Sequence, residues 1–173
     1  MTVEVRPADR ADLDFIVDLF HDMLLGARRN YYFPRPTKGR SRDEAARYMG
    51  REYRLFRGSR GFVYVAEVGG KRAGFVSAQV KVDRAHYRTP LRTGVIQEIH
   101  VHPTFWRGGV GTALMRAAEQ ELARRGCRKT WVWSMAWSTP AHAFYRRQGY
   151  RVVYLQFEKR NRPTPHPRAP RSR

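Results

Sequence analysis

The sequence predicts an α/β (α+β) fold in which a mixed central β-sheet of about six to seven strands is flanked by about four helices. Strand-like and helix-like segments follow one another in the order β-α-α-β-β-β-α-β-α-β, and helices that cross between strands imply a mixed sheet covered by helices. A length of 173 residues, of which 42% are hydrophobic, fits one domain with a substantial core.

The first third of the chain predicts one strand and two helices. Val3 and Val5 alternate with polar residues before Pro7, which indicates a short strand. Asp9 is a candidate N-cap for the amphipathic helix that follows. A second helix is predicted over residues 43–56, where apolar side chains recur at helical spacing at Ala46, Met49, Tyr53 and Phe56.

Three strands are predicted in the middle of the chain. Residues 62–68 and 73–82 are rich in β-branched and aromatic side chains. Between them lies Gly69-Gly70, which suits the tight turn of an antiparallel hairpin. The third strand is expected over residues 95–101, after a polar loop.

Two helices and two strands complete the predicted domain. A helix over about residues 110–125 follows a glycine-rich turn and ends at Gly126. We then expect a strand over 129–135, a helix from about 140 to 149, and a last strand over 150–157.

Residues 1–158 are therefore expected to form a single domain, and residues 159–173 a disordered tail. The tail holds six Lys or Arg residues, four prolines and no acidic residue. Such a composition cannot bury enough apolar surface to form a core.

The chain is strongly basic, with 34 Lys and Arg residues against 15 Asp and Glu and a net charge of +19. Without the tail the charge is still +13, and residues 28–60 alone carry +8. A surface of this kind attracts polyanions, so one interpretation is contact with nucleic acid. The other is a solvated arginine-rich surface with no partner. The oligomeric state is left open, with a homodimer among the alternatives.

Cysteine content and hydropathy indicate the compartment. The single cysteine, Cys127, excludes an intrachain disulfide framework and a thiolate-rich metal site, which favours a reducing environment. The first ten residues include no apolar signal segment, and no run approaches the ~18 apolar residues of a membrane span. We expect a cytoplasmic protein with no membrane partner.

The glycine-rich turn before residue 110 is the most informative motif. Glycines at 108, 109 and 111 lie where a strand leads into a helix, so consecutive N–H groups can converge on an anion at the positive end of the helix dipole. This arrangement suits a diphosphate. No Gly-Lys-Ser/Thr follows, and Leu114 stands where a dinucleotide-binding fingerprint needs its third glycine. A turn that binds nothing is the alternative.

The turn resembles the acyl-CoA-binding motif of the GNAT superfamily of N-acyltransferases, Gln/Arg-x-x-Gly-x-Gly/Ala. Residues 106–111 match both glycine positions, and Trp106 stands at the Gln/Arg position. Residues 5–8 and the helix after them resemble the first strand and helix of the family. Residues 138–150 resemble its later motif, Asn-x-x-Ala-x-x-Phe/Leu-Tyr-x-x-x-Gly-Phe/Tyr, with Ser138 in place of Asn. The resemblance covers about residues 3–157 and implies the GNAT fold.

The resemblance also implies acetyl-CoA as co-substrate, without a metal. The diphosphate would lie on main-chain N–H groups of the turn. The pantetheine arm would pair with the main chain of the strand over 95–101, where that strand and the strand over 129–135 splay apart. The residues assigned to cofactor binding in this way are Ile99, Val101, Trp106, Arg107, Gly108, Gly109, Val110, Gly111, Thr112, Ser138, Ala141, Phe144 and Tyr145.

Transfer of an acyl group to an amine needs a base, and Glu98 is the candidate. It is the only acidic residue in its strand, and alternation places it on one face with Ile96 and His100. GNAT enzymes commonly use a carboxylate here, directly or through water. An ion pair with a nearby arginine is the alternative, and His100 is a second candidate base. Alternating positions alone do not make a metal site of Glu98, His100 and His102.

The reaction also needs a proton donor for the leaving thiolate. Tyr145 stands where the family often carries a tyrosine, and a phenol of pKa ~10 can donate to a thiolate of pKa ~8.5. The alternative is that Tyr145 packs beside Phe144. The oxyanion donor is expected to be a main-chain N–H near Ile99.

The predicted function is transfer of an acetyl group from acetyl-CoA to a primary amine, of a small molecule or of a protein or peptide, by direct attack in a ternary complex. Two alternatives remain at this point. One is a GNAT-like module that binds RNA or a ribonucleoprotein, and the other is an acetyltransferase that acts on an RNA-linked amine.

Overall fold

The computed structural model describes residues 2–27, 40–56, 60–83, 91–157 and 159. The chain divides into two compact units, residues 1–135 and residues 136–173, and each is described by itself. The first part of the basic segment (residues 28–39) and nearly all of the predicted tail lie outside the described residues.

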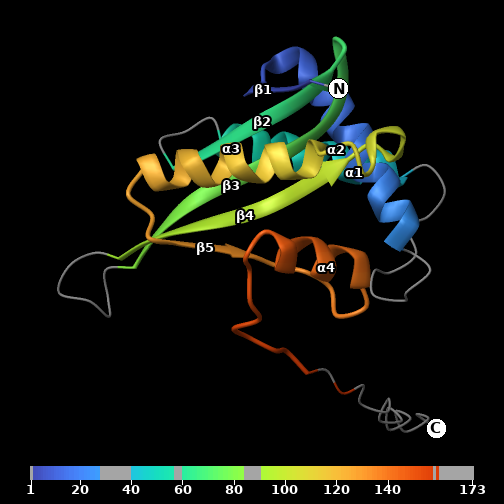
Figure 1. Cartoon of the computed structure of the whole chain (residues 1–173). Helices are drawn as coiled ribbons and strands as arrows, with labels where there is room; N and C mark the ends of the chain where they lie inside the picture. The colour runs from blue at the N-terminus through green and yellow to red at the C-terminus, as the bar shows by residue number, and fades with distance from the viewer. Residues whose placement is uncertain (1, 28–39, 57–59, 84–90, 158, 160–173) are drawn as a thin grey trace, which may run out of the picture. The chain divides into compact units, whose positions relative to one another are not determined.

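The first unit contains a mixed five-stranded sheet (Figure 1). Its strands lie side by side in chain order. Neighbours are antiparallel except for the last two, which are parallel. The predicted mixed sheet is therefore confirmed. The strands are β1 (Val3–Pro7), β2 (Gly61–Val68), β3 (Lys71–Asp83), β4 (Leu91–Val101) and β5 (Lys129–Val132).

Five strands are fewer than the six to seven that the sequence predicts, and the difference lies at the C-terminal end. Residues 150–157, predicted as a last strand, form no strand, and Phe157 is 90% exposed. The strand expected over 129–135 ends at Val132. β-Branched and aromatic residues give a segment β-propensity, but a strand forms only where a neighbouring strand accepts its hydrogen bonds. A single sequence does not show whether that neighbour is present.

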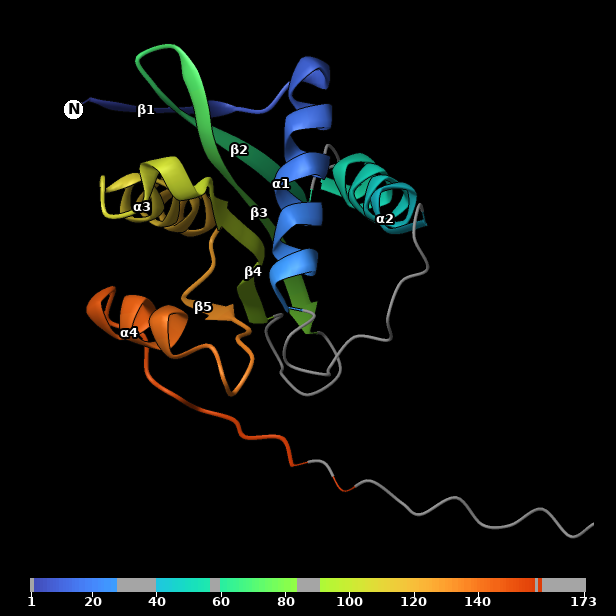
Figure 2. The same ribbon diagram turned by 90° about the vertical axis from the view of Figure 1, so that its right-hand side faces the viewer.

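Helices cover both faces of the sheet (Figure 2). On one face lie α1 (Leu13–Ala27) and α2 (Arg40–Phe56), and on the other lies α3 (Val110–Arg124). The second unit holds α4 (Thr139–Arg147), so the four predicted helices are confirmed. None of the helices in the described ranges has the length and apolar character needed to cross a membrane.

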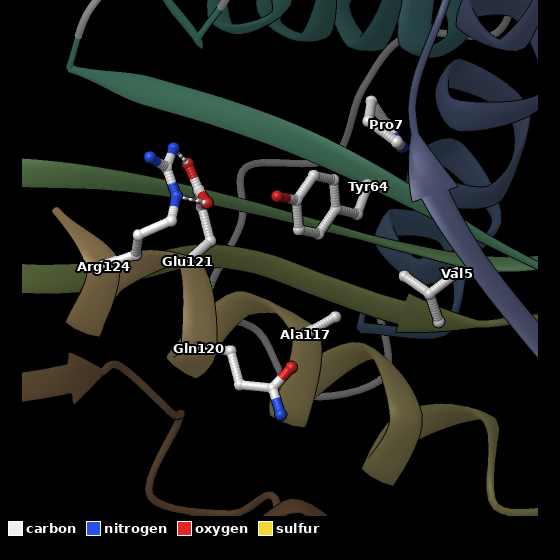
Figure 3. Close-up of a pocket in the computed structure, with 7 residues that line it drawn as sticks. All are labelled: Val5, Pro7, Tyr64, Ala117, Gln120, Glu121 and Arg124. Carbon is white, nitrogen blue, oxygen red and sulfur yellow. Dashed lines mark hydrogen bonds and ion pairs between the residues drawn. The ribbon is translucent and has the colours of Figure 1, made fainter.

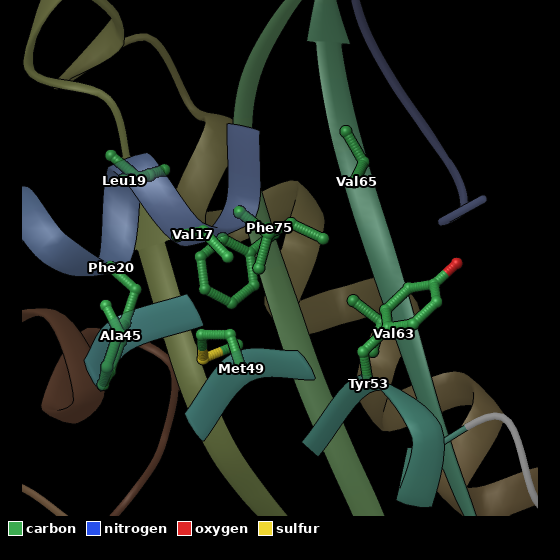
Figure 4. Close-up of a cluster of buried hydrophobic side chains, with 10 residues drawn as sticks. Val17, Leu19, Phe20, Ala45, Met49, Tyr53, Val63, Val65 and Phe75 are labelled. Carbon is green, nitrogen blue, oxygen red and sulfur yellow. The ribbon is translucent and has the colours of Figure 1, made fainter. Parts of the chain in front are cut away.

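The main hydrophobic cluster lies between α1, α2 and the strands β2 and β3 (Figure 4). Helical spacing turns one face of each helix inward, and alternation turns every second strand residue toward it. Its largest fully buried members are Phe75, Ile16 and Met49. This cluster holds α2 against the sheet and so positions Tyr48, which packs against the cluster from α2.

Asp12 anchors the N-terminal turn through a buried ion-pair network. Its carboxylate accepts hydrogen bonds from Arg6 at 2.7 Å and Arg72 at 2.6 Å, and from the main-chain N–H of Asp9 at 2.9 Å. Asp9 caps the short turn before α1, as the sequence predicts. Burial alone would raise the pKa of Asp12, but the hydrogen bonds from Arg6, Asp9 and Arg72 outweigh burial and hold this pKa well below its usual range.

Replacing Asp12 by Asn should lower the free energy of unfolding by about 3 kcal/mol at neutral pH, because two arginines lose their buried partner. A lowered native pKa stabilises the fold above the unfolded pKa of about 3.9, and this contribution is lost as the pH falls below that value. Urea unfolding should therefore show a gap between D12N and the wild type that narrows at acid pH. D14N, at an almost fully exposed side chain, is the control and should change little. A gap of the same size at pH 3 would contradict the assignment.

Candidate active site

Strand β4 carries the predicted base on the face covered by α1 and α2. Glu98 and His100 share this face, as alternation predicts. Ile96 does not share it, which corrects the prediction. The β3–β4 register shifts between Ser77 and Ala78, so Ile96 pairs with Ala78 on the face of Gly94, where an added Cβ would meet Leu122 of α3. The side chains of Glu98 and His100 are 17% and 15% exposed. Both polar groups are thus largely withdrawn from water but still reachable from outside.

Two hydrogen bonds hold the Glu98 carboxylate. The Tyr48 hydroxyl, from α2, donates to Oε1 at 3.3 Å, and Nε2 of His100 lies 2.8 Å from Oε2. No arginine in the described part of the chain is paired with Glu98, so the alternative of an Arg–Glu98 ion pair finds no support there. Glu98 therefore keeps lone pairs available for a proton from a bound amine.

Aromatic rings pack against Tyr48 and His100, the two side chains that bond to Glu98. Phe20 stacks on Tyr48 with ring centroids 5.2 Å apart and meets His100 edge-on at 5.8 Å. The ring centroid of Phe75 lies 5.3 Å from that of His100. The rings fix the side chains that touch Glu98 and keep water away from it.

Burial and the nearby Glu98 carboxylate raise the pKa of Tyr48 well above its ordinary value. The phenol therefore stays protonated at neutral pH and remains a hydrogen-bond donor to Glu98. Burial, and after it the charge of Glu98, also raises the pKa of Glu52, which lies one helical turn beyond Tyr48 on α2.

Beyond Glu98, one edge of β4 has no neighbouring strand in the described part of the sheet. The ladder to β5 pairs residues 93–96 with 129–132 and stops there. The N–H of His102, just after β4, donates to the main-chain oxygen of Ala73 in β3. Successive main-chain N–H groups of a strand point to opposite sides, so the N–H groups of Ile99 and Val101 point away from β3. We call residues 97–101 the open edge of β4.

Trp106 contacts this open edge. Its indole N–H donates to the main-chain oxygen of Val101 at 2.8 Å, although the side chain is 66% exposed. The tryptophan that stands at the Gln/Arg position of the motif thus bonds to the strand end.

The glycine turn has the backbone that the motif predicts. Gly109 has φ +82° and Arg107 has φ +61°, both in the left-handed region. Gly109 caps α3 without a side-chain hydrogen bond, and a Cβ built on it would meet open space. Within the described ranges, no hydrogen bond uses the N–H of Gly109, Val110 or Gly111. These N–H groups are available to an anion at the helix N-terminus.

The second unit carries the later motif on α4. Ser138 precedes the helix and its side chain makes no capping hydrogen bond, while its main-chain oxygen accepts from His142 at 3.0 Å. Ala141 and Phe144 follow on the same short helix, partly buried. The ring of Tyr145 lies 5.4 Å from Phe144 and meets Tyr150 edge-on at 6.0 Å.

Comparison with known proteins identifies the family. A model of the acetyltransferase (GNAT) family matches residues 21–150, more than half of the chain. The chain belongs to the GNAT family of acetyltransferases. The predicted family is confirmed, and by class this GNAT protein is an acyl-CoA-dependent N-acetyltransferase.

Similar curated proteins carry N-acetyltransferase names, and similar solved structures have the same fold. An uncharacterized N-acetyltransferase of Methanocaldococcus jannaschii is 29% identical over 150 residues, which are 86% of this chain but 61% of that relative, so the GNAT chain spans less than two thirds of its length. A GCN5-related N-acetyltransferase from Ralstonia eutropha has a TM-score of 0.70 at 21% identity, covering 91% of this chain and 98% of that one. An aminoglycoside N-acetyltransferase with a bisubstrate CoA analogue has a TM-score of 0.65 at 18% identity, covering 94% and 100%.

A separate hollow of about 290 Å³ in this GNAT protein lies on the opposite face of the sheet, between α3 and the first two strands (Figure 3). Its carboxylate, Glu121, is bonded by Arg124 at 2.8 Å and Arg125 at 2.6 Å. These arginines lower the pKa of Glu121 to about 2. The carboxylate is already neutralised, so the hollow does not suit an amine.

Tyr48 and Glu52 of this GNAT acetyltransferase are not among the site residues that the sequence predicts. Their spacing of four on a predicted helix places them on one face, and acidic residues are scarce in this chain. Nothing in the sequence shows, however, that this face of α2 meets Glu98. Among the described residues, no group of three or more His, Cys, Asp and Glu could hold a metal ion.

Proposed function

We propose that this protein transfers an acetyl group from acetyl-CoA to a primary amine by direct attack in a ternary complex. The observation that carries the proposal is the position of Glu98. Its carboxylate lies on β4, near the open edge of that strand. From the end of β4 the chain continues through a short helical turn at Pro103–Phe105 into the glycine turn before α3. A proton acceptor and an anion cradle are therefore at the same end of the sheet.

The turn and the open edge fit the co-substrate. The diphosphate would lie on the N–H groups of residues 109–111, with Arg107, Gly108 and Thr112 completing the cradle. The pantetheine arm would pair with the main chain of Ile99 and Val101, as a strand pairs with an edge. On the family resemblance we also assign Ser138, Ala141, Phe144 and Tyr145 on α4 to cofactor binding.

Each proton and charge in the transfer has a proposed partner. Acetyl-CoA supplies a thioester whose C–S bond breaks as the amine nitrogen forms a C–N bond with the acetyl carbon. Glu98 takes the proton that the amine loses. The N–H of Ile99 binds the carbonyl oxygen as negative charge develops on it. Tyr145 donates its proton to the departing CoA thiolate.

Replacing Glu98 by Gln should lower kcat/KM near neutral pH by about tenfold or more and restore it at alkaline pH. The glutamine keeps the hydrogen-bonding shape but cannot take a proton, whereas at high pH the amine is already neutral. The measurement is the pH–rate profile from 6 to 10, with thiol release as the readout. E4Q, at an exposed strand carboxylate, should keep the wild-type profile. Superimposable profiles for E98Q and the wild type would exclude Glu98 as the base.

A further inference from the structure

A second carboxylate lies beside the proposed base. We infer that Glu52 binds a second ammonium group of the acceptor while Glu98 accepts the proton of the reacting one, so that the preferred acceptor is a small diamine or polyamine. The inference rests on the proposed function and names its substrate class.

The placement of Glu52 follows from α2. The hydrogen bond from Tyr48 to Glu98 turns that face of the helix toward β4. Glu52 lies four residues further on the same face, about 6 Å along the helix axis. It is partly buried. The charges of both carboxylates act on Tyr48, that of Glu98 from β4 and that of Glu52 from α2.

Neither carboxylate has an arginine partner in the described ranges, although arginine and lysine outnumber acids in this chain by more than two to one. Other partly buried acids do have one. Glu67 is bonded by Arg6, and Glu121 by two arginines. Glu52 makes no ion pair or hydrogen bond with a described residue, and Glu98 is held only by Tyr48 and His100. A cation is the group that this pair lacks.

The charges support this assignment. Burial and the field of Glu98 disfavour the ionised form of Glu52, and only Arg51 opposes them. Two like charges in a partly desolvated space repel, and an ammonium bound at each carboxylate removes that repulsion.

A buried hydroxyl under the same site also lacks a partner. Ser77 is fully buried, and its Oγ has no hydrogen-bond partner in the described structure. Its register partner across the β3–β4 ladder is Glu98, and cross-strand partners share one face of a sheet. An unmet buried hydroxyl is costly, and it adds a polar group to the sheet face beneath Glu98.

The test compares two acceptors of equal chain length, 1,4-diaminobutane and n-butylamine. The wild type should acetylate the diamine with the higher kcat/KM. In E52Q the ratio of the two values should fall by about tenfold, mainly through KM for the diamine. E52D, which keeps the charge, should retain much of the preference. E44Q changes an exposed acid of the same helix and should leave both values as in the wild type.

The outcomes separate the two proposals. An unchanged ratio in E52Q, or equal losses for both amines, overturns the role of Glu52. Acetylation of peptide amines with no turnover of either small amine overturns the diamine assignment and leaves the acetyltransferase proposal in place. No CoA release with any primary amine overturns the proposed function itself.

Discussion

Replacing Tyr145 by Phe (Y145F) should lower kcat by roughly 10²–10⁴ while the affinity for CoA stays close to that of the wild type. The substitution removes only the phenolic hydroxyl, which is the proposed proton donor to the CoA thiolate. The ring keeps its size, so its contacts with Phe144 and Tyr150 should remain. Steady-state kinetics with thiol detection measure kcat, and calorimetry measures CoA binding.

Y150F is the matched control, because it removes a hydroxyl from the ring that meets Tyr145 edge-on in the same unit. It should retain most of the activity. Equal losses in the two variants would show that the tyrosine pair matters for packing alone. Full kcat in Y145F would mean that water or another group protonates the thiolate.

Replacing Gly109 by Val (G109V) should weaken CoA binding by at least about 100-fold. Gly109 has φ +82°, a conformation that β-branched residues adopt only with strain. A side chain here would also enter the open space over the N–H groups that form the proposed diphosphate cradle. Calorimetric titration with CoA measures the loss directly.

G70V is the control that separates the effect of backbone strain from the effect of blocking the proposed diphosphate site. Gly70 has φ +73° in the β2–β3 hairpin, and a Cβ built there also meets open space. Both variants should lose a similar amount of thermal stability, because both strain a turn in the same way. CoA affinity should fall only in G109V. Undiminished affinity in G109V would place the diphosphate elsewhere.

Much of the fold could be predicted from local patterns. The 3.6-residue spacing in α1 and α2 and the Gly-Gly hairpin between β2 and β3 led to elements that the structure confirms. The segment 150–157 shows the limit of that reasoning. It is as rich in β-branched and aromatic residues as β2, but strand formation depends on a pairing partner far away in the sequence.

The candidate site likewise combines local features that the sequence predicts with contacts between distant segments that it does not. The glycine turn is a local feature, and its positive φ at Gly109 could be expected from the motif. The neighbours of Glu98 come from a helix 50 residues earlier in the chain and from the strand beside it. Tyr48 and Ser77 become visible as site residues only when α2 and β3 are placed against β4. A single sequence does not contain that juxtaposition.

The open edge of β4 has a consequence for solubility. Unpaired N–H and C=O groups along a strand are the surface through which β-proteins add foreign strands and aggregate, and many folds cover or shorten such edges. This protein leaves residues 97–101 uncovered by β5, and the indole of Trp106 occupies only the carbonyl of Val101. The unpaired backbone groups that make the open edge of β4 suitable for an extended ligand also make the protein prone to aggregate when no ligand is bound. Binding of the proposed co-substrate along this edge would therefore also protect the protein from aggregation.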